Sequence, residues 1–527
     1  MYKLTKIFLT PILFLIFCFG IVSIVTLFLI FNLKLSFLWA LFSILILFYL
    51  LNWLTIVFIF ISKRRIEVRL TWIFVVSIFP FIGFFCFLAY GRKYKFSHKN
   101  SKYNRFLNDN FQKSDFIQTN QILNYLKEKN DNFYEPLALS FLLSKRNIYK
   151  NSNVKFLYQG SFVWYNILND LQKAKSYIFI NYFIISSGVL ANTILKILEK
   201  KLKEKIKIYI IYDHVGTYLF DNKILFLKLK RLKKIGLNLA CFQPFILPFV
   251  NNNTNFRNHR KDIIIDGKIG YSGGVNIGDH FVDWSTKYGL FYDVHSRIEG
   301  KIVKTLELIF LNDWYFATNE KINFIKKNNL ILGSNFKKLE LKQKSLNLLQ
   351  IIDDGPNQKT PIYKNVLLNF INHAQNRIWI STPYLIPPQD LIEALIIQAK
   401  LNRDVRIIIP GITDKAFILS MSKIFSVKLM KNNVKIYLLN NCFNHSKMML
   451  FDDKISIISS TNFDNRGFYS DYQTTVLNYN QKTAKNFMKE WELLFKSSTL
   501  FDVNEVKKWN KVYLLWIKFN CLFSQLI

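Results

Sequence analysis

Cysteine is scarce in this chain of 527 residues. No two cysteines form a CxxC pair, and the five lie far apart, at Cys18, Cys86, Cys241, Cys442 and Cys521. This spacing excludes a zinc ribbon and gives no sign of a disulfide framework.

Acidic residues are also few. Asp and Glu together number 35 against 71 Lys and Arg, which leaves a formal net charge of +36. Such a surplus needs an anionic partner, and nucleic acid and acidic lipid are both candidates. The chain is 51% hydrophobic and 17% aromatic, a composition that excludes an intrinsically disordered protein. Its length allows two or three domains.

Charge is absent from two long apolar runs near the N-terminus. Residues 7–31 and 35–62 contain no charged side chain, and each run exceeds the roughly 20 residues needed to cross a bilayer. They predict two consecutive membrane spans, which argues against a cleaved signal peptide. A third apolar run, residues 70–91, is interrupted by Pro80 and Gly83, so we expect it to bend.

Basic residues flank these runs unevenly. Two lysines precede the first run and one lysine separates the first two. Larger basic clusters follow the second and third runs, at Lys63, Arg64, Arg65 and Arg69, and at Arg92, Lys93, Lys95, Lys99 and Lys102. The positive-inside rule places both flanks of the third run in the cytoplasm. We therefore expect a re-entrant hairpin there, a multi-pass anchor in the cell membrane over residues 1–95, and a cytoplasmic catalytic region.

Two further segments differ in composition from the rest. Residues 96–150 are polar and rich in Asn and Lys, and we expect a connector. Residues 501–527 mix aromatic residues with lysines, which predicts a C-terminal amphipathic segment. Such a segment either lies on a membrane or packs on the protein core, and the sequence leaves both open.

An internal repeat organises residues 154–500. Helical and apolar strand patterns alternate at 162–174, 178–185, 190–202 and 207–213, and again at 363–374, 378–386, 391–401 and 405–411. This alternation predicts an α/β fold of two pseudo-symmetric halves, residues 151–330 and 331–500, each a mixed β-sheet with flanking helices.

Each half ends in the same unusual pattern. The sequences NHRKDIIIDGKIGYSGGVN and NHSKMMLFDDKISIISSTN both contain HxKxxxxD, followed ten residues later by Asn. A single HxK means little because chance supplies many, but two matched copies are highly specific. The residues that fill the pattern are His259, Lys261, Asp266 and Asn276 in the first copy, and His445, Lys447, Asp452 and Asn462 in the second.

Strand geometry explains the spacing. Residues i and i+2 of a strand face the same side, so the His and Lys of each copy point into one site. The apolar residues that follow carry the strand through a core, and Asp266 and Asp452 are expected to hold the tight turn after it rather than to react. The return strand brings the Asn of each copy back beside its Lys.

Two imidazoles, two ammonium groups and two amides around one cavity suit a phosphodiester without a metal. The lysines and asparagines bind the non-bridging oxygens. One histidine attacks phosphorus and gives a phosphohistidine, while the other protonates the leaving alkoxide and later removes the proton from the incoming alcohol or water. Imidazole suits both tasks because its pKa lies near neutrality.

These motifs resemble the signature of the phospholipase D superfamily, and more closely that of bacterial cardiolipin synthases. The resemblance extends to GGVNIGD (273–279), DVHSRIEG (293–300), TPYLIP (382–387), TNFDNR (461–466) and, in the N-terminal region, PFIGFFCFLAYGR (80–92). It covers almost the whole chain apart from residues 98–150. It implies two phospholipase D-like halves.

The resemblance implies a role for each motif residue. His259 would be the nucleophile and His445 the general acid/base. The candidate catalytic set is His259, Lys261, Asp266, His445, Lys447 and Asp452, and the phosphate-binding amides are Asn276 and Asn462.

In this family an acidic residue downstream of each histidine orients its imidazole. Asp293 occupies that position in the first half, whereas the second half carries Gln473. A glutamine cannot stabilise an imidazolium as a carboxylate does, which predicts that His445 is the less basic histidine. Asn181 stands where relatives often carry Glu, and Ser459 replaces a usual Gly.

The function implied is that of a cardiolipin synthase, which transfers a phosphatidyl group between two phosphatidylglycerol molecules and releases glycerol. Phosphatidylglycerol and an anionic membrane are the expected partners, with no cofactor, metal or nucleic acid. The alternatives are a phosphodiesterase that hydrolyses phospholipid or, less favoured, nucleic acid, and a catalytically silent membrane scaffold. The catalytic residues alone do not separate transfer from hydrolysis.

Overall fold

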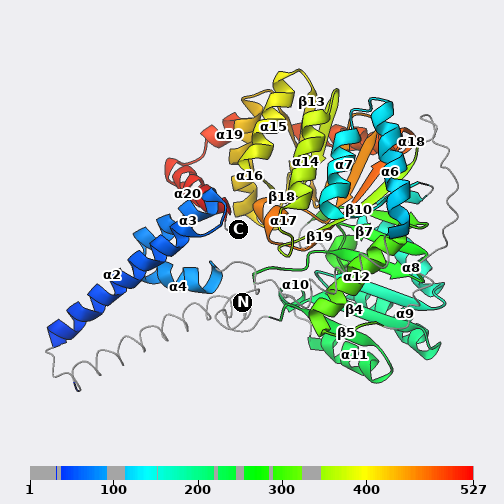
Figure 1. The fold of residues 1–527 in the computed structure, drawn as a ribbon, viewed down its shortest axis with the longest axis horizontal. Helices are drawn as coiled ribbons and strands as arrows, with labels where there is room; N and C mark the ends of the chain where they lie inside the picture. The colour runs from blue at the N-terminus through cyan, green and yellow to red at the C-terminus, as the bar shows by residue number, and fades with distance from the viewer. Residues whose placement is uncertain are drawn as a thin grey trace. The chain divides into compact units, whose positions relative to one another are not determined.

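The computed structural model describes residue 31 and residues 37–91, 113–150, 152–218, 223–244, 255–283, 289–322 and 346–525. The chain divides into two compact units: the N-terminal region through Lys93, and a larger unit that holds the remaining described residues. Figure 1 shows the fold.

The N-terminal unit consists of α2 (Phe37–Ile61), α3 (Ile66–Ile78) and α4 (Pro80–Tyr90). Among the described residues, one helix is long and apolar enough to cross a membrane, namely the 20 residues Phe42–Ile61 with a mean hydropathy of 2.6. This segment coincides with the second predicted span. The first predicted span, 7–31, falls almost entirely outside the described residues.

The third apolar run forms two short helices. Helix α3 ends at Ile78, and α4 begins at Pro80 after a break at Phe79. Proline fits the first turn of a helix because its missing N–H would have no partner there. With 13 and 11 residues, each helix is too short to span a bilayer alone. The run is therefore bent as expected, and its insertion as a re-entrant hairpin stays a prediction.

The smaller of two large sheets in the described part of the larger unit has seven strands. In sheet order these are β2 (Asn153–Tyr158), β9 (Val294–Glu299), β7 (Ile269–Gly273), β6 (Lys261–Ile265), β3 (Tyr177–Tyr182), β4 (Lys207–Asp213) and β5 (Asn238–Phe242). Strands β3, β4 and β5 run parallel, and the other neighbouring pairs run antiparallel.

The larger sheet has nine strands. In sheet order these are β1 (Ile148–Lys150), β10 (Leu348–Asp354), β19 (Gln473–Tyr479), β17 (Ile455–Ser459), β16 (Met448–Phe451), β11 (Arg377–Ser381), β13 (Asp404–Pro410), β14 (Lys435–Leu439) and β20 (Ser498–Leu500). Its seven central strands correspond in order and direction to the seven strands of the smaller sheet. Both sheets are mixed, as the α/β prediction requires.

Amphipathic helices cover these sheets. In α9, for example, Leu190, Ile194 and Leu198 recur at helical spacing and are buried, which is the pattern of a helix that packs on a sheet. The main covering helices are α8 (Gly160–Gln172), α9 (Val189–Lys203), α11 (Lys223–Lys234), α12 (Val303–Thr318), α14 (Ile362–His373), α15 (Gln389–Lys400), α16 (Ala416–Met430) and α18 (Gln481–Lys496).

The two sheets share cores. Residues of α12 pack in one apolar cluster with Ile264 of the smaller sheet and Ile351 of the larger. Residues of α18 do the same with Val294 and Met448. This packing fixes the ends of β6 and β16 relative to each other, and those ends carry the two motif copies.

Shorter elements complete the larger unit. Two small sheets pair β12 (Leu385–Ile386) with β18 (Phe463–Asp464), and β8 (Leu290–Tyr292) with β15 (Cys442–Asn444). The remaining elements are α10 (His214–Tyr218), the 3-10 turn η1 (Asp279–Val282), α17 (Asn465–Tyr469), α19 (Asn504–Lys507), α20 (Lys511–Cys521) and the 3-10 turn η3 (Leu522–Gln525).

The expected connector, residues 96–150, requires a correction. Its described part forms α6 (Lys113–Glu128), α7 (Tyr134–Ser144) and β1, which pairs with β10 at the edge of the larger sheet. Apolar residues of these helices, including Leu126 and Leu137, are buried in the same core as α14. Residues 113–150 therefore belong to the second-half core, because apolar residues of both helices recur at helical spacing and are buried there.

Candidate functional site

The first motif histidine is held by the larger sheet. Asn258 forms an isolated parallel bridge with Tyr472, and the backbone N–H of His259 donates to the Tyr472 carbonyl at 2.9 Å. The imidazole is 7% exposed. Its Nδ1 lies 2.9 Å from the backbone oxygen of Ser460 and 3.2 Å from Oε1 of Gln473.

The second motif histidine is held by the region of the smaller sheet. Asn444 pairs with Tyr292 between β15 and β8, and the backbone N–H of His445 donates to the Tyr292 carbonyl at 2.8 Å. His445 as a whole residue is 8% exposed. Its Nδ1 donates to Oδ2 of Asp293 at 2.5 Å, and this carboxylate is buried.

The orienting contacts are therefore crossed between the two motif copies, which corrects the expected pairing. Asp293 lies downstream of His259 in sequence but contacts His445, and Gln473 lies downstream of His445 but contacts His259. The prediction that His445 is the less basic histidine is wrong for this reason. The carboxylate stabilises the His445 imidazolium, whereas His259 receives only neutral acceptors.

The surroundings lower the pKa of both imidazoles to different degrees. Burial, followed by the charges of Lys261 and Lys447, lowers the pKa of His259 well below its usual value. Burial and Lys447 also lower the pKa of His445, but Asp293 opposes them. Of the two, His259 is thus the one held neutral.

Hydrogen bonding also fixes the tautomers. The Ser460 carbonyl beside His259 can only accept, so Nδ1 of His259 carries the hydrogen and Nε2 keeps its lone pair. Nδ1 of His445 likewise donates to Asp293. Each imidazole therefore presents Nε2 for reaction.

Both motif lysines are buried beside their histidines. Lys261 donates to the backbone oxygen of His259, and Lys447 donates to that of His445. Burial lowers the pKa of Lys261 well below its usual value and that of Lys447 to about 8. Two desolvated cations at one site would be stabilised by an anion between them.

The motif asparagines line the same cavity as the histidines. Oδ1 of Asn276 accepts the backbone N–H of Ile184 at 3.3 Å, which directs its NH2 group elsewhere. The side-chain oxygen of Asn462 is buried without a hydrogen-bond partner among the described residues. The NH2 group of Asn276 can therefore donate to a ligand in the cavity.

The motif aspartates lie at the other ends of the strands. Asp266 follows β6 and accepts the backbone N–H groups of residues 175–177 at 2.7–2.9 Å. Asp452 follows β16 and accepts those of residues 375–377 at 2.7–3.2 Å. Each carboxylate ties the start of β3 or β11 to the turn, so the structure does not bring these two candidates together with the histidines.

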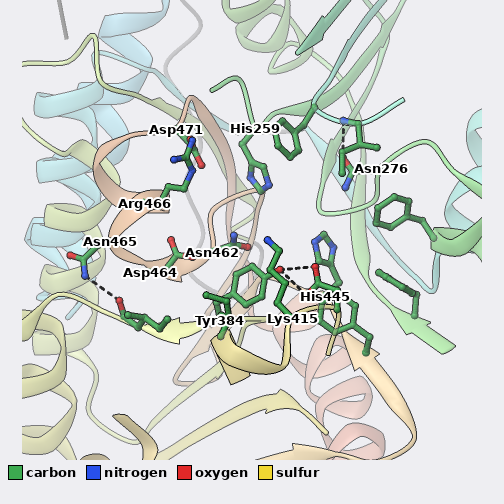
Figure 2. A pocket seen from close by; sticks show the side chains of 18 of the residues that line it. His259, Asn276, Tyr384, Lys415, His445, Asn462, Asp464, Asn465, Arg466 and Asp471 are labelled. Carbon is green, nitrogen blue, oxygen red and sulfur yellow. Dashed lines mark hydrogen bonds and ion pairs between the residues drawn. The ribbon is translucent and has the colours of Figure 1, made fainter. Parts of the chain in front are cut away.

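The cavity has a volume of about 240 Å³ and two kinds of wall (Figure 2). Aromatic and aliphatic residues form one part, at Phe183, Ile184, Phe281, Phe291, Ile386, Ile418 and Phe443. Polar residues form the other, at Asn276, Tyr384, Asp414, Lys415, Asn462, Asp464, Asn465, Arg466 and Asp471. Such a cavity can hold a molecule with a polar headgroup and an apolar tail.

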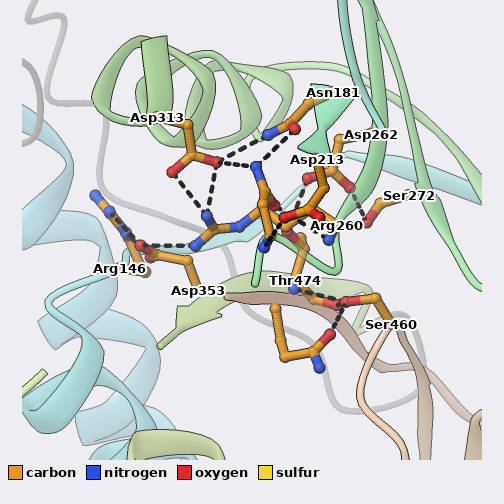
Figure 3. Close-up of polar contacts among 12 residues, drawn as sticks. Arg146, Asn181, Asp213, Arg260, Asp262, Ser272, Asp313, Asp353, Ser460 and Thr474 are labelled. Carbon is orange, nitrogen blue, oxygen red and sulfur yellow. Dashed lines mark hydrogen bonds and ion pairs between the residues drawn. The ribbon is translucent and has the colours of Figure 1, made fainter. Parts of the chain in front are cut away.

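A buried ionic network supports the first motif copy (Figure 3). Arg260 donates to both oxygens of Asp313 at 2.7 Å. Asn181 donates to Asp313 at 2.8 Å and accepts from Asn258 at 2.9 Å. Asn181 thus helps to hold the residue before His259, a role that the sequence did not reveal.

The network continues into the larger sheet. Asp353 of β10 lies 3.9 Å from Arg260 and pairs with Arg146 at 2.6 Å. Sequence reasoning missed these partners. The available signal was that Arg260 stands between His259 and Lys261 and must face away from them, where a buried guanidinium needs a carboxylate.

A second polar link joins the sheets directly. Thr474 donates to Asp262 at 2.7 Å, and Ser272 donates to the same carboxyl group at 2.7 Å. Burial raises the pKa of Asp262 to about 6, although both hydroxyls oppose the shift. This link fixes the residue after Gln473 against the strand of Lys261. Among the described residues, no group of three or more His, Cys, Asp or Glu could hold a metal ion.

Comparison with known sequences identifies related proteins. The sequence model of a family described as "Cardiolipin synthase, PLD-like domain" matches residues 367–495. The cardiolipin synthase of Alkalihalophilus pseudofirmus is 32% identical over 439 residues, which cover 82% of this chain and 84% of that protein. The cardiolipin synthase of Halalkalibacterium halodurans is 31% identical over 444 residues, which cover 83% and 85%.

Comparison with solved structures identifies a shared fold. The crystal structure of phosphatidylserine synthase from Haemophilus influenzae aligns with 74% of this chain and 100% of its own, with a TM-score of 0.58 and 13% identity. At this identity the likeness concerns the fold alone.

Proposed function

The chain belongs to the cardiolipin synthase family, and we propose that it transfers a phosphatidyl group from one phosphatidylglycerol to the terminal hydroxyl of another. The products are cardiolipin and glycerol. The observation that carries the proposal is the pair of histidines that line one cavity, each with Nδ1 hydrogen-bonded to an acceptor and Nε2 left for reaction.

In the first step, Nε2 of neutral His259 attacks phosphorus. A P–N bond forms, the P–O bond to the glycerol headgroup breaks, and His445 in its imidazolium form gives its Nε2 proton to the leaving oxygen. The crossed contacts support this division, because Asp293 stabilises the proton on His445 while His259 has no carboxylate to raise its pKa.

In the second step, His445 acts as a base. Its Nε2 removes the proton from the terminal hydroxyl of a second phosphatidylglycerol, whose oxygen attacks the phosphohistidine. The P–O bond of cardiolipin forms, the P–N bond breaks, and both histidines return to their starting states.

Cations and amides around the cavity would hold the phosphoryl oxygens. Lys261 and Lys447, buried next to the histidines, supply charge. Asn276 and Asn462, which line the cavity, supply N–H donors. Asp266 and Asp452 act through the fold by holding the turns, as their backbone contacts support.

Transfer rather than hydrolysis requires that the acceptor alcohol outcompete water. The aromatic wall of Phe281, Phe291 and Phe443 beside His445 supports this, because apolar side chains reduce the water available at the base. Hydrolysis of phospholipid, or of nucleic acid, would follow if that wall admitted water.

We also propose that the larger unit consists of two pseudo-symmetric phospholipase D-like halves. The matching strand order of its two sheets supports this division. The N-terminal region would anchor the protein in the cell membrane as a multi-pass segment, with the catalytic unit in the cytoplasm. The apolar length of α2 and the basic residues after it support this placement.

The C-terminal helix α20 would lie at the membrane surface beside the cavity. Ile517 packs with Met421 of α16, while Val512 and Leu515 on another face are 76% and 67% exposed. Ser524, directly after this helix, lines the cavity. Exposed apolar residues near lysines suit an anionic bilayer, so lipid would enter the cavity next to α20.

The reaction can be tested directly. Purified membranes that contain the protein are incubated with phosphatidylglycerol labelled in its glycerol headgroup, and lipid and water-soluble products are separated. The proposal expects one glycerol released for each cardiolipin formed, and phosphatidic acid without cardiolipin would refute it. The variants His259→Ala and His445→Ala should each lose turnover, and near-normal activity in either would refute the two-histidine mechanism.

A further inference from the structure

The two sheets differ in a coordinated way beside the histidine-orienting residues. At the end of β7, Gly273 pairs with His295, and at the corresponding place on β17, Ser459 pairs with Thr475. The next residues, Gly274 and Ser460, stand beside Asp293 and Gln473. Two glycines beside Asp293 and His295 thus correspond to two serines beside Gln473 and Thr475.

The glycines make room for the larger or charged partners. A Cβ atom on Gly274 would lie 2.0 Å from Oδ1 of Asp293, and one on Gly273 would lie 2.8 Å from Nδ1 of His295. Any side chain at position 274 would therefore displace the carboxylate that holds His445.

The serines instead make hydrogen bonds to their partners. The hydroxyl of Ser460 donates to Oε1 of Gln473 at 2.6 Å, and that of Ser459 lies 2.7 Å from the hydroxyl of Thr475. The backbone N–H of Thr474 donates to the Ser460 oxygen at 3.0 Å (Figure 3). The hydroxyl hydrogen of Ser460 has two acceptors within reach, and Oε1 of Gln473 at 2.6 Å is nearer than the Thr474 carbonyl at 3.3 Å.

An amide, unlike a carboxylate, has two different ends. With Oε1 toward His259, Gln473 shares the Nδ1 hydrogen with the nearer Ser460 backbone carbonyl, and Nε2 of the imidazole keeps its lone pair. With the NH2 group there instead, the amide would present hydrogens to a nitrogen that already carries one. Asp293 has no such ambiguity because its two oxygens are equivalent.

We propose that Ser460 is a positioning residue that fixes the orientation of the Gln473 amide, so that Gln473 joins the Ser460 backbone carbonyl in accepting the Nδ1 hydrogen of His259. The larger sheet carries the pair Ser460 and Gln473 at the place where the smaller sheet carries the pair Gly274 and Asp293. Gln473 then orients the imidazole without adding a negative charge. The inference rests on the proposed function only in that His259 is the nucleophile.

A charged replacement should reveal this neutrality. The charged and titratable groups that face His259 are Lys261, Lys447 and His445, with Arg466 and Asp471 on the same cavity wall. In Gln473→Glu, a new carboxylate raises the pKa of His259. Since the nucleophile must be neutral, the acidic limb of the kcat/KM profile moves to higher pH.

The decisive test is a double-mutant cycle in the full-length protein, measured as cardiolipin formation in mixed micelles. Ser460→Ala should lower kcat about tenfold, the effect of one buried hydrogen bond, with little change in KM. In the Gln473→Glu background the same substitution should cost less than about twofold, because a carboxylate needs no orientation. Ser459→Ala is the matched control, since Ser459 does not contact Gln473, and it should keep the wild-type kcat.

Three results would overturn the inference. The first is an unchanged kcat in Ser460→Ala. The second is an equal loss of kcat in the wild-type and Gln473→Glu backgrounds, which would indicate a purely structural role of Ser460 toward Thr474. The third is an acidic limb of the kcat/KM profile that does not move in Gln473→Glu. If Ser460→Ala does not fold, the pH profile of Gln473→Glu still tests the inference. A wild-type protein that makes no cardiolipin would refute the proposed function instead, and phosphoenzyme formation from a labelled phosphodiester would then carry the same comparison.

Discussion

Replacement of Asp293 by asparagine separates charge from hydrogen bonding at His445. The asparagine oxygen can still accept the Nδ1 hydrogen that now reaches Oδ2 at 2.5 Å. The substitution therefore keeps the tautomer and removes the charge that stabilises the imidazolium.

The size of the effect follows from the burial of the pair. Asp293 is 1% exposed and His445 is 8% exposed, so water screens little of the attraction. Two unit charges about 4 Å apart interact by about 4 kcal/mol at an effective dielectric constant of 20, which corresponds to about 3 pKa units. Although burial alone would raise it, the pKa of Asp293 is lowered by His445 and Lys447, which agrees in direction with a strong pair.

The sign of the pH effect follows from the role of the proton. His445 must be protonated to assist the leaving group, and the loss of the carboxylate lowers its pKa. The basic limb of the kcat/KM profile should move to lower pH by up to about 3 units, with a fall of about 100- to 1000-fold at neutral pH. Glycerol release is measured across pH in mixed micelles.

A substrate with an aryl leaving group tests the cause. Such a group leaves without protonation, so Asp293→Asn should release it at nearly the wild-type rate. Asp390→Asn is the control, because this carboxylate pairs with Lys364 away from the cavity and should leave both profiles unchanged. An equal loss on both substrates, with normal thermal unfolding, would show that Asp293 does not act by protonating the leaving group.

Three further predictions follow from other contacts. Gly274→Ser should reduce transfer at least about 100-fold, because the new Cβ would displace Asp293 while the contact of Gln473 with His259 stays intact. Normal activity of this variant would refute the steric argument. Asp452→Ala should lower the free energy of unfolding by about 2–3 kcal/mol, seen as a reduced Tm with kcat retained per folded molecule, since its carboxylate accepts backbone N–H groups of residues 375–377. Leu515→Gln on α20 should reduce transfer on anionic vesicles but not in micelles, whereas Leu493→Gln on α18, where the leucine is 57% exposed against 67% for Leu515, should reduce neither.

Local sequence patterns were sufficient for most of the secondary structure. The strand expected at 207–213 coincides with β4, and the helix expected at 363–374 differs from α14 by one residue at each end. These elements have strong apolar periodicity, which directly reflects one buried face. The prediction of a connector was wrong because it rested on the Asn and Lys content of the segment, whereas apolar residues of α6 and α7, such as Leu126 and Leu137, recur at helical spacing and are buried.

The crossed histidine contacts could not be read from the sequence. The partner of His259 lies 214 residues away at Gln473, and that of His445 lies 152 residues away at Asp293. Motif spacing identifies residues that share a strand face, but it does not say which strand of one sheet lies against which strand of the other. The bridges that join Asn258 to Tyr472 and Asn444 to Tyr292, together with the cores shared by the two sheets, set this pairing.

The crossing gives the asymmetry between Asp293 and Gln473 a chemical consequence. Two histidines in similar surroundings can share one proton in two ways, and the proposed mechanism starts only from the arrangement with neutral His259 and protonated His445. Two carboxylates would raise both pKa values and leave these arrangements nearly balanced. One carboxylate, placed on His445 alone, favours the productive arrangement by the difference between the two pKa values. A glutamine at position 473 is therefore compatible with the proposed activity, and it supports the proposed division of attack by His259 and proton transfer by His445.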